Sequence, residues 1–386
     1  MDFRHWIFVG NWDLEIGNFI MKSTNGKIEI KSKAKLTRKS LPLIYTPGVA
    51  ELSKKIAKNK KWVYGLTWKK NNVAVVSDGS AVLGLGNLGP EAALPVMEGK
   101  AVLFKELGGV DAVPIVLATQ NKEEIIKIVK AIAPSFGGIN LEDISAPRCF
   151  EIEERLVKEL DVPVFHDDQH GTAIAVLAGL INALRLVRKN IAKVKIVISG
   201  AGAAGIAVSK LLLKYGAKNM IIFDSQGSLC CRCERDLEGA KKEIACATNN
   251  EKYIKGLSAA LLGADVFIGV SAPNLLKKQD IQKMNKGSIV FAMSNPVPEI
   301  SYKEAKKGGA AVVATGRSDF PNQINNALVF PGIFRGALDT RTRLITDRTK
   351  IKAALAIASL IKKPKSDKIV PEVLDKRVVK AVAKVF

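Results

Sequence analysis

The chain has 386 residues and a formal net charge of +22, with 59 lysines and arginines against 37 aspartates and glutamates. Its length suits two domains, and 47% hydrophobic with 25% charged residues is typical of a folded protein, which excludes a disordered one. No uncharged apolar run reaches the roughly 18–20 residues that a membrane span needs, so we expect no membrane partner.

The basic charge has two explanations. A basic surface can bind nucleic acid through its phosphates, or a lysine-rich, solvated surface can attract anionic substrates. The lysines are scattered, with modest clusters at 31–39, 54–61 and 362–368, and no aromatic-interleaved basic stretch accompanies them. This favours the second explanation, and we expect no nucleic-acid partner.

Residues 1–20, MDFRHWIFVGNWDLEIGNFI, have neither a continuous apolar core nor a small-residue cleavage site, so we expect no signal peptide. Met21 begins a more ordinary start. We interpret the preceding segment as an accessory extension or a mis-assigned start, and expect a protein that begins at Met21 to fold and turn over normally.

The first half is mixed, and its apolar runs predict strands and helices at 72–78, 112–119, 122–133 and 149–160. Tyr45 precedes a Thr-Pro-Gly turn, Lys100 lies in a glycine-dense stretch, and Glu142 and Asp143 end an apolar run. Each has an ordinary explanation: a core tyrosine, a solvated lysine and a helix N-cap pair. Considered one at a time, these residues do not identify a site.

The stretch VPVFHDDQHGTAIAV, residues 162–176, has two interpretations. If it is helical, His166 and His170 share a face and can hold zinc. If a strand ends at His166, the chain turns through 167–169 and a helix starts near Gly171, which puts the aspartates at the carboxyl end of a strand. The second interpretation is favoured, because the helical pattern begins only after His170, and both histidines are then structural hydrogen-bonding residues.

The second half alternates apolar runs with helical patterns. We predict strands at 193–199, 220–224, 264–271, 288–294 and 311–315, a helix at 206–217, and a lysine-rich helical tail from about 350. Runs this apolar are expected of parallel strands buried on both faces. The predicted fold class is α/β: a doubly wound parallel sheet of the Rossmann type beside a mixed α/β domain.

A glycine turn joins the first of these strands to its helix. Residues 200–205 read G-x-G-x-x-G, formed by Gly200, Ala201, Gly202, Ala203, Ala204 and Gly205. This spacing allows a tight turn, close approach of a pyrophosphate and close packing of the helix on the strand. Asp224 ends the next strand, where a carboxylate binds a ribose diol and repels a 2′-phosphate. We therefore expect a dinucleotide site that prefers NAD+ over NADP+.

Cysteines cluster just beyond Asp224, in SLCCRCERD (228–236). A zinc site from Cys230, Cys231, Cys233 and Cys246 is conceivable, but C-C-x-C packs thiols more tightly than the usual spacing. We expect exposed, reduced thiols that are sensitive to oxidation. Since the five cysteines form no even, spread framework, a reducing cytoplasmic location is favoured.

Eight blocks in order resemble the malic enzyme family, specifically its short prokaryotic type. They run from about residue 35 to 340: YTPGVA, VSDGSAVLGLGNLGP, MEGKAVLFKELGGVDAVPI, NLEDISAPRCFEIE, FHDDQHGTA, GAGAAG, SNPVPE and TGRSDFPNQINNALVFPGIFRGAL. The resemblance implies oxidative decarboxylation of (S)-malate to pyruvate and CO2 with reduction of NAD+. It also implies a requirement for Mg2+ or Mn2+, activity on oxaloacetate, and a homodimer.

The resemblance also assigns roles to residues. It implies that Tyr45 is the general acid, that Lys100 is the general base, and that the metal ligands are Glu142, Asp143 and Asp168. Three carboxylates form a hard-oxygen site that suits Mg2+ or Mn2+ rather than zinc.

Four further residues are expected around these groups. Asp167 orients a ligand or the lysine. Asn295, with Asn325 or Asn326, holds the substrate carboxylate and the cofactor carboxamide. For Lys100 to act as a base, we expect its surroundings to lower its pKa.

One departure narrows the subtype. The larger eukaryotic enzymes place an arginine after the aspartate-glycine of their DG block to hold a substrate carboxylate, whereas this chain reads DGSAVLG. Ser80, backbone amides or another residue must replace the arginine. The enzyme alternative, another hydroxy-acid or amino-acid dehydrogenase with a Rossmann domain, does not need the three carboxylates together.

From the resemblance to malic enzymes we expect the chain to divide into four segments. They are an extension at 1–20, an N-terminal catalytic domain at 21–162, an NAD-binding domain at 163–345 and a C-terminal helical tail at 346–386.

Overall fold

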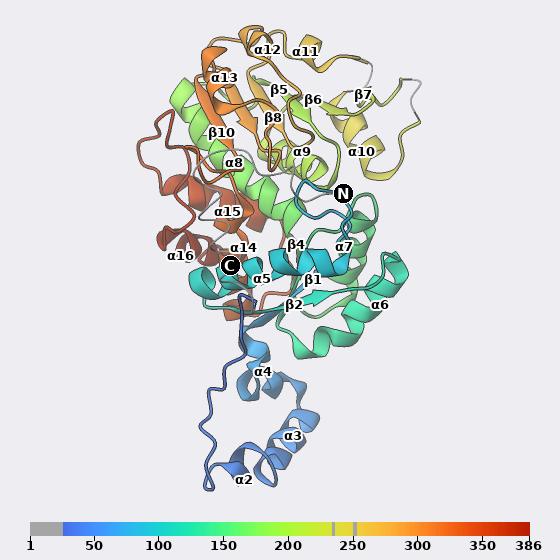
Figure 1. Cartoon of the computed structure of the whole chain (residues 1–386), viewed down its shortest axis with the longest axis vertical. Helices are drawn as coiled ribbons and strands as arrows, with labels where there is room; N and C mark the ends of the chain where they lie inside the picture. The colour runs from blue at the N-terminus through green and yellow to red at the C-terminus, as the bar shows by residue number, and fades with distance from the viewer. Residues whose placement is uncertain (1–25, 234–235, 250–252) are drawn as a thin grey trace, which may run out of the picture.

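The computed structural model describes residues 26–233, 236–249 and 253–386, so the predicted extension at 1–20 lies outside the described residues. Two separate sheets, each flanked by helices, form the body of the protein (Figure 1). This is the predicted α/β architecture.

The first sheet is parallel and has the strand order β2-β1-β3-β4. Its strands are β1 (Asn72–Ser77), β2 (Asp111–Val116), β3 (Gly138–Leu141) and β4 (Val164–His166). The helices of this half are α5 (Pro90–Gly108), α6 (Lys122–Ile132) and α7 (Arg148–Glu159). Every residue of β1 is buried, as expected for a central strand covered on both faces. Because β4 pairs with β3, this sheet extends past the boundary expected at residue 162.

The second sheet has the order β10-β9-β8-β5-β6-β7, and only the short β7 among its described strands runs antiparallel. Its strands are β5 (Lys195–Ser199), β6 (Asn219–Asp224), β7 (Gly227–Ser228), β8 (Val266–Gly269), β9 (Ile289–Ala292) and β10 (Val312–Thr315). The helices of this half include α9 (Ala203–Tyr215), α10 (Gly239–Thr248), α11 (Leu257–Ala260), α12 (Lys278–Gln282) and α13 (Tyr302–Lys307). The predicted doubly wound sheet is confirmed.

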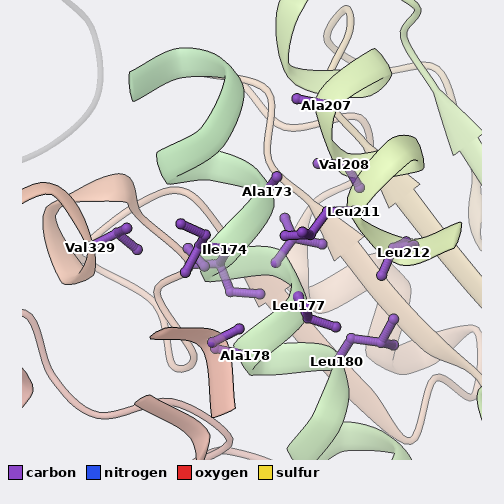
Figure 2. Close-up of a cluster of buried hydrophobic side chains, with 14 of the residues drawn as sticks. Ala173, Ile174, Leu177, Ala178, Leu180, Ala207, Val208, Leu211, Leu212 and Val329 are labelled. Carbon is purple, nitrogen blue, oxygen red and sulfur yellow. The ribbon is translucent and has the colours of Figure 1, made fainter. Parts of the chain in front are cut away.

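Helix α8 (Asp167–Val187) carries the chain from the first sheet to the second. The expected turn through 167–169 is wrong, because β4 ends at His166 and α8 begins at Asp167 without a break. Ala173, Ile174, Leu177 and other apolar side chains of α8 pack in the core against α9 (Figure 2). The helix has the length and hydropathy of a membrane span, but 67% of that window is buried inside the protein, as in a core helix.

The C-terminal helices return to the first half of the molecule. They are α14 (Phe330–Thr340), α15 (Asp347–Ser359) and α16 (Arg377–Ala383), so the predicted helical tail is interrupted over 360–376. Phe330 of α14 packs on Phe104 of α5, with ring centroids 4.6 Å apart. Helix α14 therefore supports the first domain although it follows the second sheet in the chain.

The N-terminal arm, which we define as residues 41–66, projects from the body (Figure 1). It comprises α2 (Leu41–Ile44), α3 (Gly48–Lys58), the 3-10 turn η2 (Lys60–Trp62) and α4 (Val63–Leu66). None of these four elements has a buried residue.

The cysteine cluster differs from the expected reduced thiols. Cys230 is bonded to Cys233, and Cys231 is bonded to Cys246 of α10. Among the described residues, the free cysteine is the buried Cys149. The four sulfurs are therefore paired covalently, where spacing alone indicated neither disulfides nor zinc.

Candidate active site

The predicted carboxylates meet at the carboxyl edge of the first sheet. Glu142 and Asp143 follow β3, and Asp168 lies in the first turn of α8, directly after β4. Because β3 and β4 are neighbours, these side chains converge, and one oxygen of each lies within 4.8 Å of the others. His166 and His170 are not part of this cluster, which leaves a site of oxygen donors rather than a histidine site.

The backbone of Asp143 fixes the geometry of the cluster. Its φ of +52° is in the left-handed region, which is uncommon for residues other than glycine but accessible to aspartate. In this conformation, its N–H donates to Asp168 Oδ2 at 2.7 Å. Asp143 Oδ2 is buried with no hydrogen-bond partner among the described residues. A buried carboxylate oxygen without a hydrogen-bond partner, beside two other carboxylates, is the arrangement expected of a cation site.

The electrostatics of the cluster favour a cation. Burial, together with the charges of Asp168 and Glu142, raises the pKa of Asp143 to about 9. Burial and Asp168 also raise the pKa of Glu142, although Lys100 opposes the shift. Groups that resist ionisation because they repel one another are stabilised as anions by a divalent ion. The residues therefore fit Mg2+ or Mn2+, which prefer oxygen ligands.

Lys100 projects from α5 into the same cluster. Its Nζ lies 2.5 Å from Glu142 Oε1 and 2.5 Å from Asp167 Oδ2, and 4.5 Å from the centre of the Phe330 ring. The prediction that the surroundings of Lys100 lower its pKa is wrong. Burial does lower the pKa of Lys100, but attraction to Asp167, Glu142 and Asp168 outweighs it and raises the pKa above its ordinary value. The expected contact between Asp167 and the lysine is present.

A second buried polar cluster lies behind these carboxylates and was not found from the sequence. Glu153 of α7 accepts hydrogen bonds from the backbone N–H of His166 at 2.8 Å and from Gln169 at 3.2 Å. It also lies 2.9 Å from Nε2 of His170, whose Nδ1 lies 3.1 Å from Lys350 Nζ. Burial lowers the pKa of His170, so we assign a neutral ring that accepts from Lys350 and donates to Glu153. The expected hydrogen-bonding role of His170 is present. That of His166 is not, because both ring nitrogens of this buried side chain have no hydrogen-bond partner among the described residues.

The loop of the DG block lacks the arginine of the larger enzymes, and Arg148 holds it instead. Ser80 is buried and its hydroxyl donates to Asp78 at 2.5 Å, so it is committed to the loop rather than open to a substrate. Arg148 donates to the other oxygen of Asp78 from Nε and Nη2, at 3.2 and 2.9 Å. Arg148 belongs to the block that carries Glu142, but no pattern in the sequence indicates that it returns to this loop.

A pocket of about 1070 Å³ opens at the predicted dinucleotide turn. Gly200, Ala201, Gly202 and Asp224 line it from the second sheet, and Ala146, Pro147 and Phe150 line it from the first domain. Ala203, Ala204 and Gly205 form the first turn of α9, whose N-cap is Gly202. A Cβ at Gly205 would lie 1.8 Å from the carbonyl oxygen of Gly200, so the third glycine is needed for close packing.

Asp224 is not alone at the rim of this pocket. Its Oδ2 lies 2.9 Å from Nζ of Lys241 on α10, and its Oδ1 accepts from the backbone N–H of Gln226 at 2.9 Å. Lys241 also lines the pocket. The expected ribose-binding carboxylate is thus paired with a cation that spacing did not indicate.

The asparagines and the tyrosine occupy different places. Asn295 adjoins the glycine-rich loop, since a Cβ at Gly84 would lie 1.9 Å from its carbonyl oxygen. Asn325 caps η5 (Asn326–Leu328) by accepting from Ala327 N–H at 2.8 Å. Asn326 instead adjoins Gly171 of α8, close to Asp167.

Tyr45 lies in the projecting arm and is 68% exposed, so the structure does not bring it to Lys100 of its own chain.

Comparison with known families accounts for nearly the whole chain. The malic enzyme N-terminal domain matches residues 23–127 and 119–157, and the malic enzyme NAD-binding domain matches residues 169–385. The chain belongs to the malic enzyme family. These two matches correspond to the two sheets, with β4 and the start of α8 between them.

Related proteins and structures agree. The chain is 57% identical to an NAD-dependent malic enzyme of Geobacillus stearothermophilus, over 92% of this chain and 75% of that protein. It is 54% identical to a bifunctional malic/malolactic enzyme of Bacillus subtilis, over 94% and 89% of the two chains. The crystal structure of an NAD-dependent malic enzyme from Thermotoga maritima superposes with a TM-score of 0.91 at 48% identity, covering 98% of this chain and 99% of that one.

Proposed function

We propose that this malic enzyme converts (S)-malate to pyruvate and CO2 with reduction of NAD+, and that it requires Mg2+ or Mn2+. The convergence of Glu142, Asp143 and Asp168 around Lys100 carries this proposal. Another hydroxy-acid dehydrogenase would not need three carboxylates together. The enzyme is also proposed to decarboxylate oxaloacetate, the β-keto acid expected after the oxidation.

The metal ion and the cofactor would supply two kinds of chemistry. A divalent ion held by the three carboxylates would polarise the C2 oxygen of malate and offset the negative charge beside Lys100, while the nicotinamide would accept a hydride. Lys100 is proposed to take the proton of the C2 hydroxyl, and Asp167, whose Oδ2 lies 2.5 Å from Nζ, is proposed to orient it. Tyr45 is proposed to protonate C3 after CO2 leaves.

Asn295 and Asn326 are proposed to bind the substrate carboxylate and the cofactor carboxamide. Asn325 is the less suitable choice because its side chain caps η5.

The preferred cofactor, the oligomeric state and the location are also proposed. We propose NAD+ over NADP+ because Asp224 stands at the rim of the pocket, although relatives include NADP-dependent malic enzymes, such as that of Halomonas elongata. We also propose a cytoplasmic homodimer.

The direct test is NAD+ reduction with malate, with and without Mn2+, while pyruvate is monitored. Asp168→Ala should abolish malate oxidation while NAD+ still binds. Retained activity of this variant at saturating Mn2+ would remove Asp168 from the metal site.

A melting experiment tests the metal site without turnover. Mn2+ should raise the melting temperature of the wild type, since an ion that binds only the folded state stabilises it. Asp143→Asn should remove this Mn2+-dependent rise. It should itself raise the melting temperature without metal at neutral pH, because burial raises the pKa of Asp143 to about 9, so that Asp143 must take up a proton on folding and asparagine need not. An equal Mn2+ shift in both proteins would place the ion elsewhere.

The roles of Lys100 and Tyr45 separate in two half-reactions. Lys100→Ala should slow both malate oxidation and the reduction of supplied oxaloacetate, because both pass through proton transfer at the C2 oxygen. Tyr45→Phe should slow malate turnover but largely spare oxaloacetate reduction, which needs no proton at C3. A positioned acid or base contributes about 10²–10⁴-fold. Equal losses in both half-reactions for Tyr45→Phe would mean that the tyrosine also serves the hydride step.

A further inference from the structure

Two carboxylates of the site lie in the first turn of α8. Asp167 and Asp168 are the first two residues of this helix, and His166 is its N-cap. Asp167 Oδ2 lies 2.5 Å from Lys100 Nζ, and Asp168 belongs to the carboxylate cluster that is proposed to hold the ion. The backbone of this one turn therefore decides where both carboxylates point. Within the described residues, the side chain of His166 makes no capping hydrogen bond, so the turn is not fixed by its own N-cap side chain.

The turn is capped by Glu153, which belongs to a different helix, α7. In an ordinary capping box, the side chain three residues after the N-cap accepts from the backbone N–H of the N-cap residue. That position is Gln169, whose side-chain amide instead donates to Glu153 Oε2 at 3.2 Å, while Glu153 Oε1 accepts from the N–H of His166 at 2.8 Å. Glu153 therefore does from α7 what a carboxylate within α8 ordinarily does. Because it is only 8% exposed, water has little access to take over these bonds.

Glu153 is itself held in place through α15. Its Oε2 also lies 2.9 Å from Nε2 of His170, and Nδ1 of that ring lies 3.1 Å from Nζ of Lys350. The side chain of Lys350 is 11% exposed, so this contact also lies inside the protein. The carboxylate of Glu153 is therefore fixed on α7 by its own helix and on α8 by three hydrogen-bonding groups.

The groups bonded to Glu153 flank Asp167 and Asp168 along the chain. Its backbone partner, the last residue of β4, precedes the pair, and its two side-chain partners in α8 follow it. We propose that Glu153 is a positioning residue that fixes this turn and thereby aims Asp168 at the metal ion and Asp167 at Lys100. The inference rests on the proposed function, in which Asp168 binds the ion and Lys100 takes the proton of the C2 hydroxyl. A Glu153 that served stability alone would affect Mn2+ binding no more than another buried hydrogen-bonding residue of α8.

Titration with Mn2+ alone tests the metal part of the inference. Glu153→Leu keeps the approximate volume but removes both acceptor oxygens, whereas Glu153→Gln keeps one oxygen for the backbone N–H of His166. Loss of a group that orients a metal ligand typically lowers metal affinity about 10- to 100-fold. We expect Glu153→Leu to raise the dissociation constant for Mn2+ by about this factor and Glu153→Gln to raise it less. Isothermal titration calorimetry, at a temperature where circular dichroism shows each variant to be folded, measures both.

Kinetics test the part of the inference that concerns Lys100. Excess Mn2+ can refill the metal site of a variant, but it cannot restore the contact between Asp167 and Lys100. At a Mn2+ concentration that saturates each protein, kcat for malate should therefore stay about 10-fold or more below wild type in Glu153→Leu. The dissociation constant for NAD+ should not change, because neither Glu153 nor the groups bonded to it line the cofactor pocket.

Asn182→Ala is the matched control on the same helix. Asn182 lies towards the other end of α8, is fully buried, and donates to the carbonyls of Ala358 and Ile369 at 2.9 and 2.8 Å. Its removal takes these bonds from two carbonyls, so it should destabilise the protein. Because the lost bonds do not involve the first turn, the dissociation constant for Mn2+ and kcat should stay at their wild-type values.

The outcomes separate this inference from the proposed function. A folded Glu153→Leu protein that binds Mn2+ with wild-type affinity would overturn the inference, as would an equal loss of affinity in Asn182→Ala. If Glu153→Leu does not fold, Glu153→Gln decides, and wild-type values of both its Mn2+ affinity and its kcat would overturn the inference. Recovery of the full wild-type kcat at saturating Mn2+ would overturn the role of Glu153 towards Lys100. A wild type that binds no Mn2+ would overturn the proposed metal site, and the wild-type titration therefore distinguishes the two failures.

Discussion

At the residue scale, Asp224 and Lys241 form a pair that controls the charge at the rim of the cofactor pocket. Asp224 repels a 2′-phosphate and at the same time neutralises Lys241, 2.9 Å away. We predict that Asp224→Ala lowers kcat/KM for NAD+ and raises it for NADP+, because Lys241 can then pair with the phosphate. Hydrogen bonds to charged groups contribute about 1.5–3 kcal/mol, or roughly 10- to 100-fold in the ratio of the two cofactors.

Steady-state kinetics with both cofactors measures this ratio. The double variant Asp224→Ala/Lys241→Ala should lose the gain with NADP+. Lys210→Ala, which removes an exposed ion pair with Glu243, is the matched control and should leave the ratio unchanged. A wild type that already favours NADP+ would show that Lys241 governs the choice in spite of Asp224.

Glu153 should make stability depend on pH. Burial alone would raise its pKa, but His170, Lys350 and His166 hold it at about 2. Since the folded pKa lies below the ordinary value of 4.5, the contribution of Glu153 is present above about pH 4.5 and is lost as pH falls towards 2. We predict that Glu153→Gln destabilises the protein by about 3 kcal/mol at pH 7 and by much less near pH 2–3.

Denaturant unfolding at the two pH values tests this. Glu159→Gln, at an exposed pair with Lys130, is the control and should change the free energy of unfolding far less than Glu153→Gln does at pH 7. The same loss from Glu153→Gln at both pH values would contradict the prediction and would point to lost packing rather than lost charge.

The residues that could be predicted differ physically from those that could not. Glu142, Asp143 and Asp168 follow apolar runs, and the ends of neighbouring parallel strands meet at one edge of a sheet, so position along the chain determines proximity. Lys350 contacts His170, and Lys241 contacts Asp224 at the cofactor pocket. In each case the two segments in contact are related by no periodic pattern in the sequence. The raised pKa of Lys100 likewise depends on the summed charge around it, which spacing does not reveal.

At the scale of elements, the strands were predictable because burial on both faces leaves long apolar runs, as in β1 and β8. The start of α8 was not. Asp167 and Asp168 are polar, and polar residues after a strand favour a turn. Acidic residues are, however, also favoured in the first turn of a helix, where they interact with the helix dipole. Of the arm, only the motif around Tyr45 could be recognised, since none of its four elements has a buried residue.

One disulfide leads to a prediction at the scale of elements. Cys231–Cys246 ties the segment after β7 to α10, and the N–H of Cys231 donates to the carbonyl of Asn249 at 2.9 Å. Because α10 carries Lys241 to the pocket, we predict that reducing this bond raises KM for NAD+ severalfold with little change in kcat. A loop of this length contributes about 3 kcal/mol, so the melting temperature should also fall.

The experiment compares oxidised and dithiothreitol-treated protein, with the thiols counted in each. Cys231→Ser/Cys246→Ser should resemble the reduced protein. A variant with serine at all four paired cysteines should not respond to reductant. Complete reduction with an unchanged KM for NAD+ would show that α10 is held by its other contacts alone.

At the scale of the whole molecule, the two domains are joined more tightly than two successive domains along a chain would be. Helix α8 begins at the first sheet and ends in the core of the second, and the C-terminal helices return to α5. Fold class and domain order were predictable, because each follows from local patterns. The return of α14 to α5 was not, since no periodic pattern relates these two segments of the chain.

The last helix should therefore influence the active site from a distance. Val382 of α16 is fully buried against Gly332 of α14, where an added Cβ would lie 2.6 Å from Cβ of the valine. The same helix, α14, carries Phe330, whose ring lies 4.5 Å from Lys100 Nζ. We predict that Val382→Ala destabilises the protein by about 2 kcal/mol, since it removes buried methyl groups and leaves a gap. It should also lower kcat for malate modestly, because Phe330 loses support, while KM for NAD+ is unchanged because the cofactor pocket is lined by other elements. Denaturant unfolding and steady-state kinetics measure both effects, with the exposed Lys362→Ala as the control. A change below about 0.5 kcal/mol, the usual range for surface substitutions, would mean that α16 contributes little to the packing of α14.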